Sequence, residues 1–327
     1  MKIEECPDLS AGPGEAVISV HRAGINFADL MMRLGLYDAA PDFPFTPGYE
    51  VSGVIKELGE GSEGFDIGQR VVALPRFGGY SEQVVVRPEQ MLPLDPETGF
   101  EAAAAMPVIY VTAFHMLVHL GNIQPGDTLL VHHAAGGVGT AVAQIARAYE
   151  AGTIFGVASS PKREFVEAQG MRFIDRKGED FVKVVKRETG GAGVHHALDP
   201  VGGPHLMRSY KALRQGGRLF VFGGSTFAPG ASLSRLRAMM EYIRTPKFAP
   251  LRMMASNKAV IGVHVGRFKD TELLKRELLM LLGMLGTRRI APVVDRVFRF
   301  EDVIEAHHYI HARKNRGKVL LDFSPAG

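Results

Sequence analysis

The segment Thr128-Leu-Leu-Val-His-His-Ala-Ala-Gly-Gly-Val-Gly139 decides the fold class of this chain. Its first five residues form an apolar run typical of a buried strand, and the spacing Ala134-x-Gly136-x-x-Gly139 then leads into a helical pattern. A tight glycine turn between strand and helix lets backbone N–H groups approach a pyrophosphate. Alanine replaces the first glycine of the usual fingerprint. The alternative to nucleotide binding is that these glycines only let the helix pack on the strand. We expect a dinucleotide-binding turn whose cofactor contacts come from Gly136, Gly137 and Val138.

Strand-like and helix-like segments alternate after this turn. Predicted strands lie at 153–157, 172–174, 194–198 and 218–222, with predicted helices at 162–169, 180–188 and 204–213. Such alternation with short links is typical of a doubly wound parallel sheet. The first hundred residues instead alternate apolar and polar side chains between turns rich in glycine and proline, which is typical of a small β-rich module. The last sixty residues return to mixed structure, including the apolar runs Ile290–Val294 and Lys318–Leu321. The whole pattern predicts an α/β Rossmann domain inserted into a β-rich domain built from both ends of the chain.

Composition excludes several classes of protein. Among 327 residues, 38 basic and 35 acidic side chains give a net charge of +3, and the basic residues are scattered, so no nucleic acid partner is expected. The one cysteine, Cys6, excludes an intrachain disulfide and a multi-cysteine zinc site. No apolar run approaches the roughly 18 residues of a membrane span. The first residues also lack the apolar core of a signal peptide. We expect a soluble cytoplasmic protein.

The end of the second predicted Rossmann strand indicates which nucleotide is bound. NAD-specific sites place an acid there, whereas this chain has Val157-Ala-Ser-Ser-Pro-Lys-Arg163. Hydroxyls and cations attract the 2′-phosphate of NADPH, and an acid would repel it. In the alternative reading the Ser-Ser-Pro sequence is simply a helix cap, which uses the same groups. We therefore expect NADPH, held by Ser159, Ser160, Lys162 and Arg176.

Six segments match one known family in the expected order: Ala23–Met31, Gly35–Tyr37, Thr46–Gly53, Val131–Gly139, Leu198–Gly203 and Asn315–Leu320. They resemble the medium-chain dehydrogenase/reductase superfamily, within it the quinone oxidoreductase group and the branch of the vesicle amine transport protein. The resemblance implies a GroES-like catalytic domain in two parts, 1–108 and 259–327, around an NADPH-binding Rossmann domain at 109–258. It also implies a homodimer that pairs the strand near Ala259–Val263.

The chain departs from the zinc-dependent members of that family. Those relatives hold a catalytic zinc partly by a cysteine and a histidine, where this chain has Asn26 and Tyr49. Neither residue type suits a tetrahedral zinc site. The histidine pairs at 132–133, 195–196 and 307–308 are adjacent in sequence, and neighbours in a strand point to opposite faces. We therefore expect no metal.

Without a Lewis acid, the substrate must accept hydride with little help. Quinones and α,β-unsaturated carbonyls (enones) suit this chemistry, because the charge moves to an oxygen that a hydrogen-bond donor stabilises. The resemblance makes Asn26 and Tyr37 the catalytic candidates, although Asn26 could serve only as a loop cap and Tyr37 only in packing. Asp29 is expected to fix the local backbone. The resemblance also assigns to the cofactor cleft Thr112, Gly223 and Lys318.

The expected function is an NADPH-dependent, zinc-independent reductase of quinones or enones. Two alternatives stay open, namely a reductase of enoyl thioesters and a non-catalytic NADPH-binding protein associated with vesicles or membranes. The basic, methionine-rich segment 232–258 has three readings: a lid, a peripheral membrane contact, or a helix packed on the domain seam.

Overall fold

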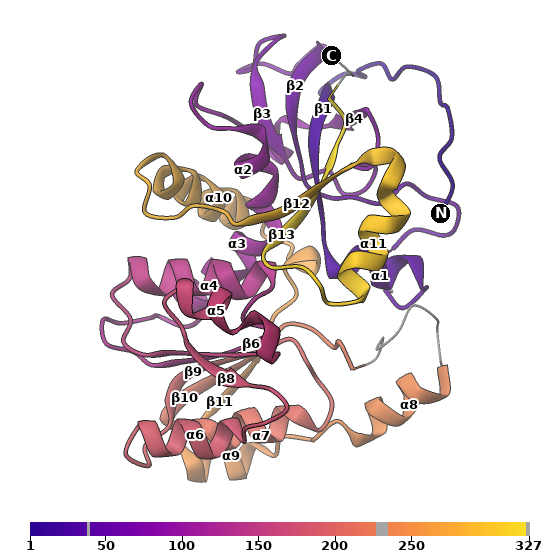
Figure 1. Ribbon diagram of the computed structural model, residues 1–327. Helices are drawn as coiled ribbons and strands as arrows, with labels where there is room; N and C mark the ends of the chain where they lie inside the picture. The colour runs from indigo at the N-terminus through magenta and orange to yellow at the C-terminus, as the bar shows by residue number, and fades with distance from the viewer. Residues whose placement is uncertain (38–39, 227–234, 325–327) are drawn as a thin grey trace. The chain divides into compact units, whose positions relative to one another are not determined.

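The computed structural model describes residues 1–37, 40–226 and 235–324 (Figure 1). The chain forms two compact units, one made of Met1–Val111 with Arg267–Gly327 and the other of Thr112–Gly266. The second unit thus spans 112–266, whereas the Rossmann domain was expected at 109–258. The second limit shifts because strand β11 (Ala259–Gly262), expected to open the returning part, pairs inside the second unit. Among the described residues, no helix combines the length and hydropathy of a membrane span.

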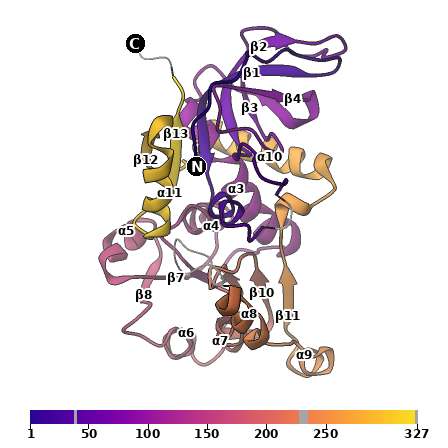
Figure 2. The same cartoon turned by 90° about the vertical axis from the view of Figure 1, so that its right-hand side faces the viewer.

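The first unit is built on a seven-stranded sheet in the order β12-β13-β1-β2-β3-β5, with β4 also pairing β1. Its pairs are antiparallel except β12 with β13, and these two strands lie beside α11 in Figure 2. Apolar side chains such as Ile18, Ile55 and Leu321 form its buried core. The strands are β1 (Ala16–Ile25), β2 (Val51–Leu58), β3 (Arg70–Ala73), β4 (Gln83–Val86), β5 (Met91–Pro93), β12 (Val294–Arg299) and β13 (Lys318–Asp322).

Along the chain, the helices of the first unit lie between these strands. They are α1 (Phe27–Arg33), α2 (Phe100–Ala105), α10 (Thr271–Gly286) and α11 (Val303–His311), and α3 (Pro107–Phe114) then leads the chain into the second unit. In the apolar run Ile290–Val294, residues 290–293 have no regular structure and β12 begins only at Val294. Pro292 lacks the N–H that a sheet ladder needs, so pairing starts after it.

The second unit contains a six-stranded parallel sheet in the order β11-β10-β9-β6-β7-β8. Helices α4 and α5 cover one face and α6 and α7 the other (Figure 1). The predicted doubly wound α/β fold is therefore confirmed. The remaining strands are β6 (Leu129–His132), β7 (Ile154–Ala158), β8 (Arg172–Asp175), β9 (Val194–Asp199) and β10 (Leu213–Val221). The helices are α4 (Gly137–Ala148), α5 (Arg163–Ala168), α6 (Phe181–Glu188), α7 (His205–Ala212), α8 (Arg235–Arg244) and α9 (Pro250–Ser256).

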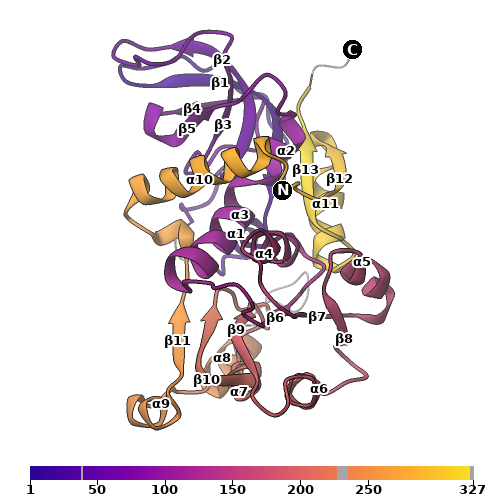
Figure 3. The same ribbon diagram turned by 90° about the vertical axis from the view of Figure 1, so that its left-hand side faces the viewer.

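This strand order has two consequences for function. The strands after β6 are added on one side of it and the strands from β9 onwards on the other, so the winding of the chain reverses between β6 and β9. Open α/β sheets bind ligands at the carboxyl ends of strands at such a switch point. Strand β11 stands at the outer edge of the sheet, as Figure 3 shows, and within the described residues it pairs only with β10. The switch point and this edge are therefore the places to look for a ligand and for a second copy of the chain.

Candidate active site

The predicted nucleotide turn joins β6 to α4. Its left-handed residue is His133, with φ of 53°, so alanine at position 134 does not have to adopt that conformation. The Gly136 N–H donates to the His133 carbonyl (2.8 Å), which closes the turn on itself. A Cβ on Gly139 would lie 2.5 Å from the Ala134 carbonyl oxygen, so only glycine lets the helix start this close to the strand. The first N–H groups of α4 then face the carboxyl edge of the sheet, where they suit a pyrophosphate.

The residues predicted to select NADPH follow β7. Ser159 precedes a short 3-10 turn (Ser160–Lys162), in which Lys162 is half-buried. The exposed Arg176 lies nearby, since its backbone N–H donates to the Ala158 carbonyl (2.8 Å). The structure therefore brings the ends of β7 and β8 together, as the cofactor prediction requires.

An acid also belongs to this group, and sequence reasoning missed it. The Ser160 hydroxyl donates to Asp175 Oδ2 (2.9 Å), at the end of β8. The Lys177 backbone N–H and the Ser160 hydroxyl hold the pKa of Asp175 below its ordinary value, so this carboxyl is charged at neutral pH. A negative charge thus stands among the groups expected to hold a phosphate. Its sequence signal is the acid in Phe173-Ile-Asp175, which ends the strand after the one that indicates the nucleotide.

In the first unit, the predicted catalytic Asn26 and the predicted cofactor residue Lys318 meet. Asn26 follows β1, and its Nδ2 donates to Glu50 Oε1 (2.6 Å). Lys318 Nζ donates to Asn26 Oδ1 (2.6 Å) and forms a very close ion pair with the same Glu50 oxygen. All three side chains are buried. The structure therefore assigns Lys318 a fixed partner in Glu50.

Glu50 is the centre of this cluster and was not predicted as a site residue. Its second oxygen accepts the Val108 backbone N–H (2.8 Å). A Cβ on Gly24 would lie 2.3 Å from Glu50 Oε1, so the glycine makes room for the carboxylate. Its only sequence signal was its place in the motif Thr46–Gly53, which says nothing of a partner.

The cluster fixes how the Asn26 amide can act. Its oxygen faces an ammonium and its nitrogen a carboxylate, so only one orientation of the amide satisfies both neighbours. Nδ2 carries two hydrogens, and Glu50 accepts a hydrogen bond from one of them. The second hydrogen is held in a defined direction and can be donated to an oxygen atom of a ligand.

Asp29, three residues after Asn26, is a second buried carboxyl. It accepts the Asn26 backbone N–H (2.8 Å) and the Tyr80 hydroxyl (3.0 Å), as expected for a residue that fixes the local backbone. Burial raises the pKa of Asp29 to about 7. The pKa of Tyr49 is also raised, chiefly by burial and further by the nearby Asp29 and Tyr37. Its phenol therefore stays protonated.

The other predicted residues lie in two loops and inside a helix. Tyr37 is half-buried in the loop after α1, and its carbonyl accepts the Ala40 N–H (3.0 Å). Thr112 is a half-buried residue of α3. Gly223 follows β10, and a Cβ there would come within 3.0 Å of the Pro200 carbonyl, so glycine lets this loop approach the end of β9.

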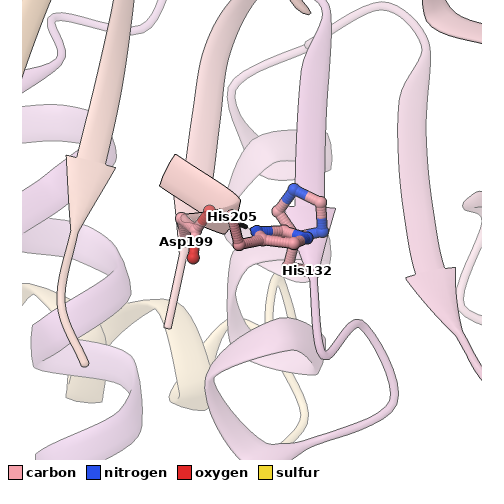
Figure 4. A group of neighbouring side chains, drawn as sticks. All are labelled: His132, Asp199 and His205. Atoms are coloured by element: carbon pink, nitrogen blue, oxygen red, sulfur yellow. Dashed lines mark hydrogen bonds and ion pairs between the residues drawn. The ribbon is translucent and has the colours of Figure 1, made fainter. Parts of the chain in front are cut away.

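A polar cluster that sequence reasoning missed lies at the switch point. His132 ends β6, Asp199 ends β9, and His205 and Ser209 lie on α7; Figure 4 shows the first three. Ser209 Oγ bonds Asp199 Oδ2 (2.6 Å) and His132 Nε2 (3.0 Å), and His205 Nδ1 lies 2.7 Å from Asp199 Oδ2. Unlike neighbouring histidines in one strand, His132 and His205 come from different elements and point toward the same carboxylate.

Two models of known families match the chain. The alcohol dehydrogenase GroES-like domain matches residues 12–96, and the zinc-binding dehydrogenase model matches residues 137–279. Together with the parallel sheet and its glycine turn, these matches define the class of protein as an oxidoreductase with separate GroES-like and Rossmann-type domains.

Relatives give the family. The synaptic vesicle membrane protein VAT-1 homolog of Rattus norvegicus is 37% identical over 98% of this chain and 80% of the relative. Quinone oxidoreductase-like protein 2 of Bos taurus is 31% identical over 98% of this chain and 88% of the relative. The chain belongs to the medium-chain dehydrogenase/reductase superfamily, close to VAT-1 homologues and quinone oxidoreductase-like proteins, as the sequence motifs predicted.

Solved structures agree with this assignment. The quinone oxidoreductase of Escherichia coli, solved in complex with NADPH, superposes with a TM-score of 0.85 at 25% identity, covering 98% of this chain and 94% of that one. CurK enoyl reductase superposes with a TM-score of 0.81 at 25% identity, with the same coverage. These superpositions confirm the expected fold over nearly the whole chain.

Proposed function

We propose that this protein is an NADPH-dependent reductase that transfers hydride to quinones or α,β-unsaturated carbonyl compounds without a catalytic metal. The observation that carries the proposal is the clamped amide of Asn26, which offers one fixed hydrogen-bond donor. The solved quinone oxidoreductase complex with NADPH supports the choice of cofactor. Asn26 and Tyr49, standing where the zinc-dependent relatives are expected to place ligands, support a metal-free reaction.

The residues of the second unit fit a dinucleotide. The turn at Gly136–Gly139 has no room for side chains at Gly139, and its helix start offers N–H groups to a pyrophosphate. Lys162 and Arg176 supply two cations for a 2′-phosphate against the single carboxylate of Asp175. NADPH, when bound, supplies the reducing equivalent.

In the proposed mechanism the first unit stabilises the substrate oxygen. Asn26 donates its second Nδ2 hydrogen to that oxygen as negative charge develops there. The Glu50–Lys318 pair holds the amide in place, so no reorganisation is needed during the reaction. Tyr37 is the proposed second donor, and Tyr37→Phe tests it by removing only the hydroxyl. Thr112, Gly223 and Lys318 keep the roles in the cofactor cleft that the resemblance gives them; for Lys318 this role is indirect, through Asn26.

The test is steady-state oxidation of NADPH by the purified protein with a panel of quinones, enones and enoyl thioesters. The proposal expects turnover with quinones or enones. A clear preference for enoyl thioesters would favour the alternative that the CurK neighbour supports. Nucleotide binding without turnover of any acceptor would favour the non-catalytic alternative.

A homodimer is part of the proposal. β11 pairs with β10 on one side, and its other edge carries backbone groups that pair with nothing among the described residues. Unpaired strand edges are templates for a second chain. Two copies of β11 would join their sheets into one.

Peripheral membrane contact is a second candidate function. The segment expected at 232–258 forms α8 and α9, and its first residues, 232–234, lie outside the described part of the chain. On α8, Met239, Met240, Tyr242 and Ile243 are each at least 50% exposed. Exposed Arg244, Lys247 and Arg252 follow them. An apolar helix face with basic neighbours suits an anionic bilayer. Sedimentation with phosphatidylserine vesicles tests this contact, with Met239→Ser/Ile243→Ser as the variant expected to stay in the supernatant.

A further inference from the structure

Three metal-ligating side chains converge at the switch point of the second unit, although they lie far apart in the sequence. His132, Asp199 and His205 each offer one ligand atom, and these atoms all lie within 4.8 Å of one another (Figure 4). They come from the ends of two neighbouring parallel strands and from the first turn of α7. His132 directly precedes the Rossmann turn, and none of the three residues belongs to the Asn26 cluster.

We propose that His132, Asp199 and His205 form a binding site for a divalent transition metal ion, with Zn²⁺ as the best fit. Two imidazoles and one carboxylate are the ligand set of several open zinc sites. The site lacks the many oxygen ligands that Mg²⁺ and Ca²⁺ require. The Ser209 hydroxyl lies 3.0 Å from His132 Nε2 and 2.6 Å from Asp199 Oδ2, so it adjoins two of the three ligand atoms.

The surroundings orient the ligands before any ion arrives. Asp199 Oδ1 accepts the backbone N–H groups of Val201 (2.8 Å) and Gly202 (3.2 Å), which leaves Oδ2 directed at the histidines. The ring of His132 packs edge-on against Phe181, with 4.7 Å between the ring centroids. Such outer contacts fix the rotamers of metal ligands and strengthen binding.

Charge also favours the ion. The Asp199 side chain is fully buried, and its Oδ2 faces the two imidazoles. A buried carboxylate attracts a cation. The side chain of His205 is 21% exposed, which gives the ion a way in.

Without metal, hydrogen bonds hold the same groups together. His205 Nδ1 then donates to Asp199 Oδ2, and the Ser209 hydroxyl connects this carboxylate with His132. The ion would replace the proton between His205 and Asp199, while the outer contacts remain. These hydrogen bonds satisfy the same groups without an ion, so we expect the intact metal-free chain to be usable for binding measurements.

The experiment titrates the metal-stripped full chain with Zn²⁺ by calorimetry, with Co²⁺ as a spectroscopic probe and Mg²⁺ as the negative control. The wild type is expected to bind one Zn²⁺ or Co²⁺, with the Co²⁺ spectrum of a four-coordinate nitrogen and oxygen site, and no Mg²⁺. His205→Asn, a change at a partly exposed position, should weaken Zn²⁺ binding by at least about 100-fold, since loss of an outer contact alone costs 10–100-fold. His195→Asn is the matched control, because His195 contacts Asp127 elsewhere in the same unit.

A second readout is thermal unfolding. Zn²⁺ should raise the Tm of the wild type and of His195→Asn but not that of His205→Asn, because an ion that binds only the native state stabilises it. Absence of one-to-one binding by the wild type would overturn the proposal. Equal affinity of the wild type and His205→Asn would overturn it as well. Neither outcome bears on the reductase function, which does not use this ion.

Discussion

Lys318, the first residue of β13, forms a buried ion pair with Glu50, which lies directly before β2. The two side chains are 2% and 0% exposed, so neither charge has water as an alternative partner. Asn26 bonds to both members of the pair. A pair this well buried stabilises little by itself, but it defines one geometry for the amide between its charges.

Removing one member of this pair should be far worse than removing both charges. We expect Lys318→Met to lower the free energy of unfolding by about 3–5 kcal/mol, because it leaves the Glu50 charge buried without a partner. The double variant Glu50→Gln/Lys318→Met should recover most of that loss. Urea unfolding followed by circular dichroism measures both. If the double variant is no more stable than Lys318→Met, the stranded charge is not the cause.

Asp29 should make stability fall as pH rises. The pKa of Asp29 is about 7 in the folded chain against an ordinary value of 3.8, so between these values the native state binds more protons than the unfolded state. Stability from this group is then lost as pH increases from about 4 to about 7, by up to roughly 4 kcal/mol. Asp29→Asn keeps an acceptor for Tyr80 and for the Asn26 N–H but cannot ionise.

The measurement is the free energy of unfolding of wild type and Asp29→Asn at several pH values from 4 to 8. The difference between the two should change steadily in favour of the variant as pH rises. A constant difference over this range would show that Asp29 titrates at its ordinary pKa.

Nucleotide preference should respond in opposite directions to two substitutions. Lys162→Ala is expected to raise the Kd of NADPH by about tenfold, equal to ~1.4 kcal/mol, with little change for NADH. Asp175→Asn removes the charge that the 2′-phosphate would meet, so it should lower the Kd of NADPH and leave that of NADH nearly unchanged. Fluorescence titration with both nucleotides measures this. Parallel changes for NADPH and NADH in both variants would contradict a 2′-phosphate site here.

The proposed dimer depends on backbone groups of β11. The Val263 N–H donates to the Val221 carbonyl, so by alternation the Gly262 N–H points away from β10. A Cβ at Gly262 meets nothing within 4 Å, which makes room for a larger residue. Gly262→Pro should give a monomer in light scattering, whereas Gly262→Ala, which keeps the N–H, should stay dimeric. A dimeric Gly262→Pro protein would place the interface elsewhere.

Much of the second unit could be predicted from local pattern, because buried parallel strands are short apolar runs between helices with one apolar face. The Gly139 requirement is also local, since it depends on atoms five residues away. The apolar run Ile290–Val294 does not pair over its whole length, because Pro292 lacks the N–H that a sheet ladder needs.

The candidate sites depend on contacts that local pattern does not encode. Asn26 and Lys318 are 292 positions apart, and they meet only because β1 and β13 are neighbours in the sheet. His132 and Asp199 meet because β6 and β9 are adjacent at the switch point. Asp175 reaches Ser160 because β7 and β8 end side by side. In each case the sequence shows the residue, but it does not show which distant residue its side chain contacts.

The most direct test of the central claim is the rate of NADPH oxidation by Asn26→Ala with a quinone or enone acceptor, with the Kd of NADPH measured separately. The account predicts that kcat falls about 10²–10³-fold, as for loss of one donor to a developing oxyanion, while the Kd of NADPH stays unchanged. A kcat equal to that of the wild type, in a variant that still binds NADPH, would contradict it.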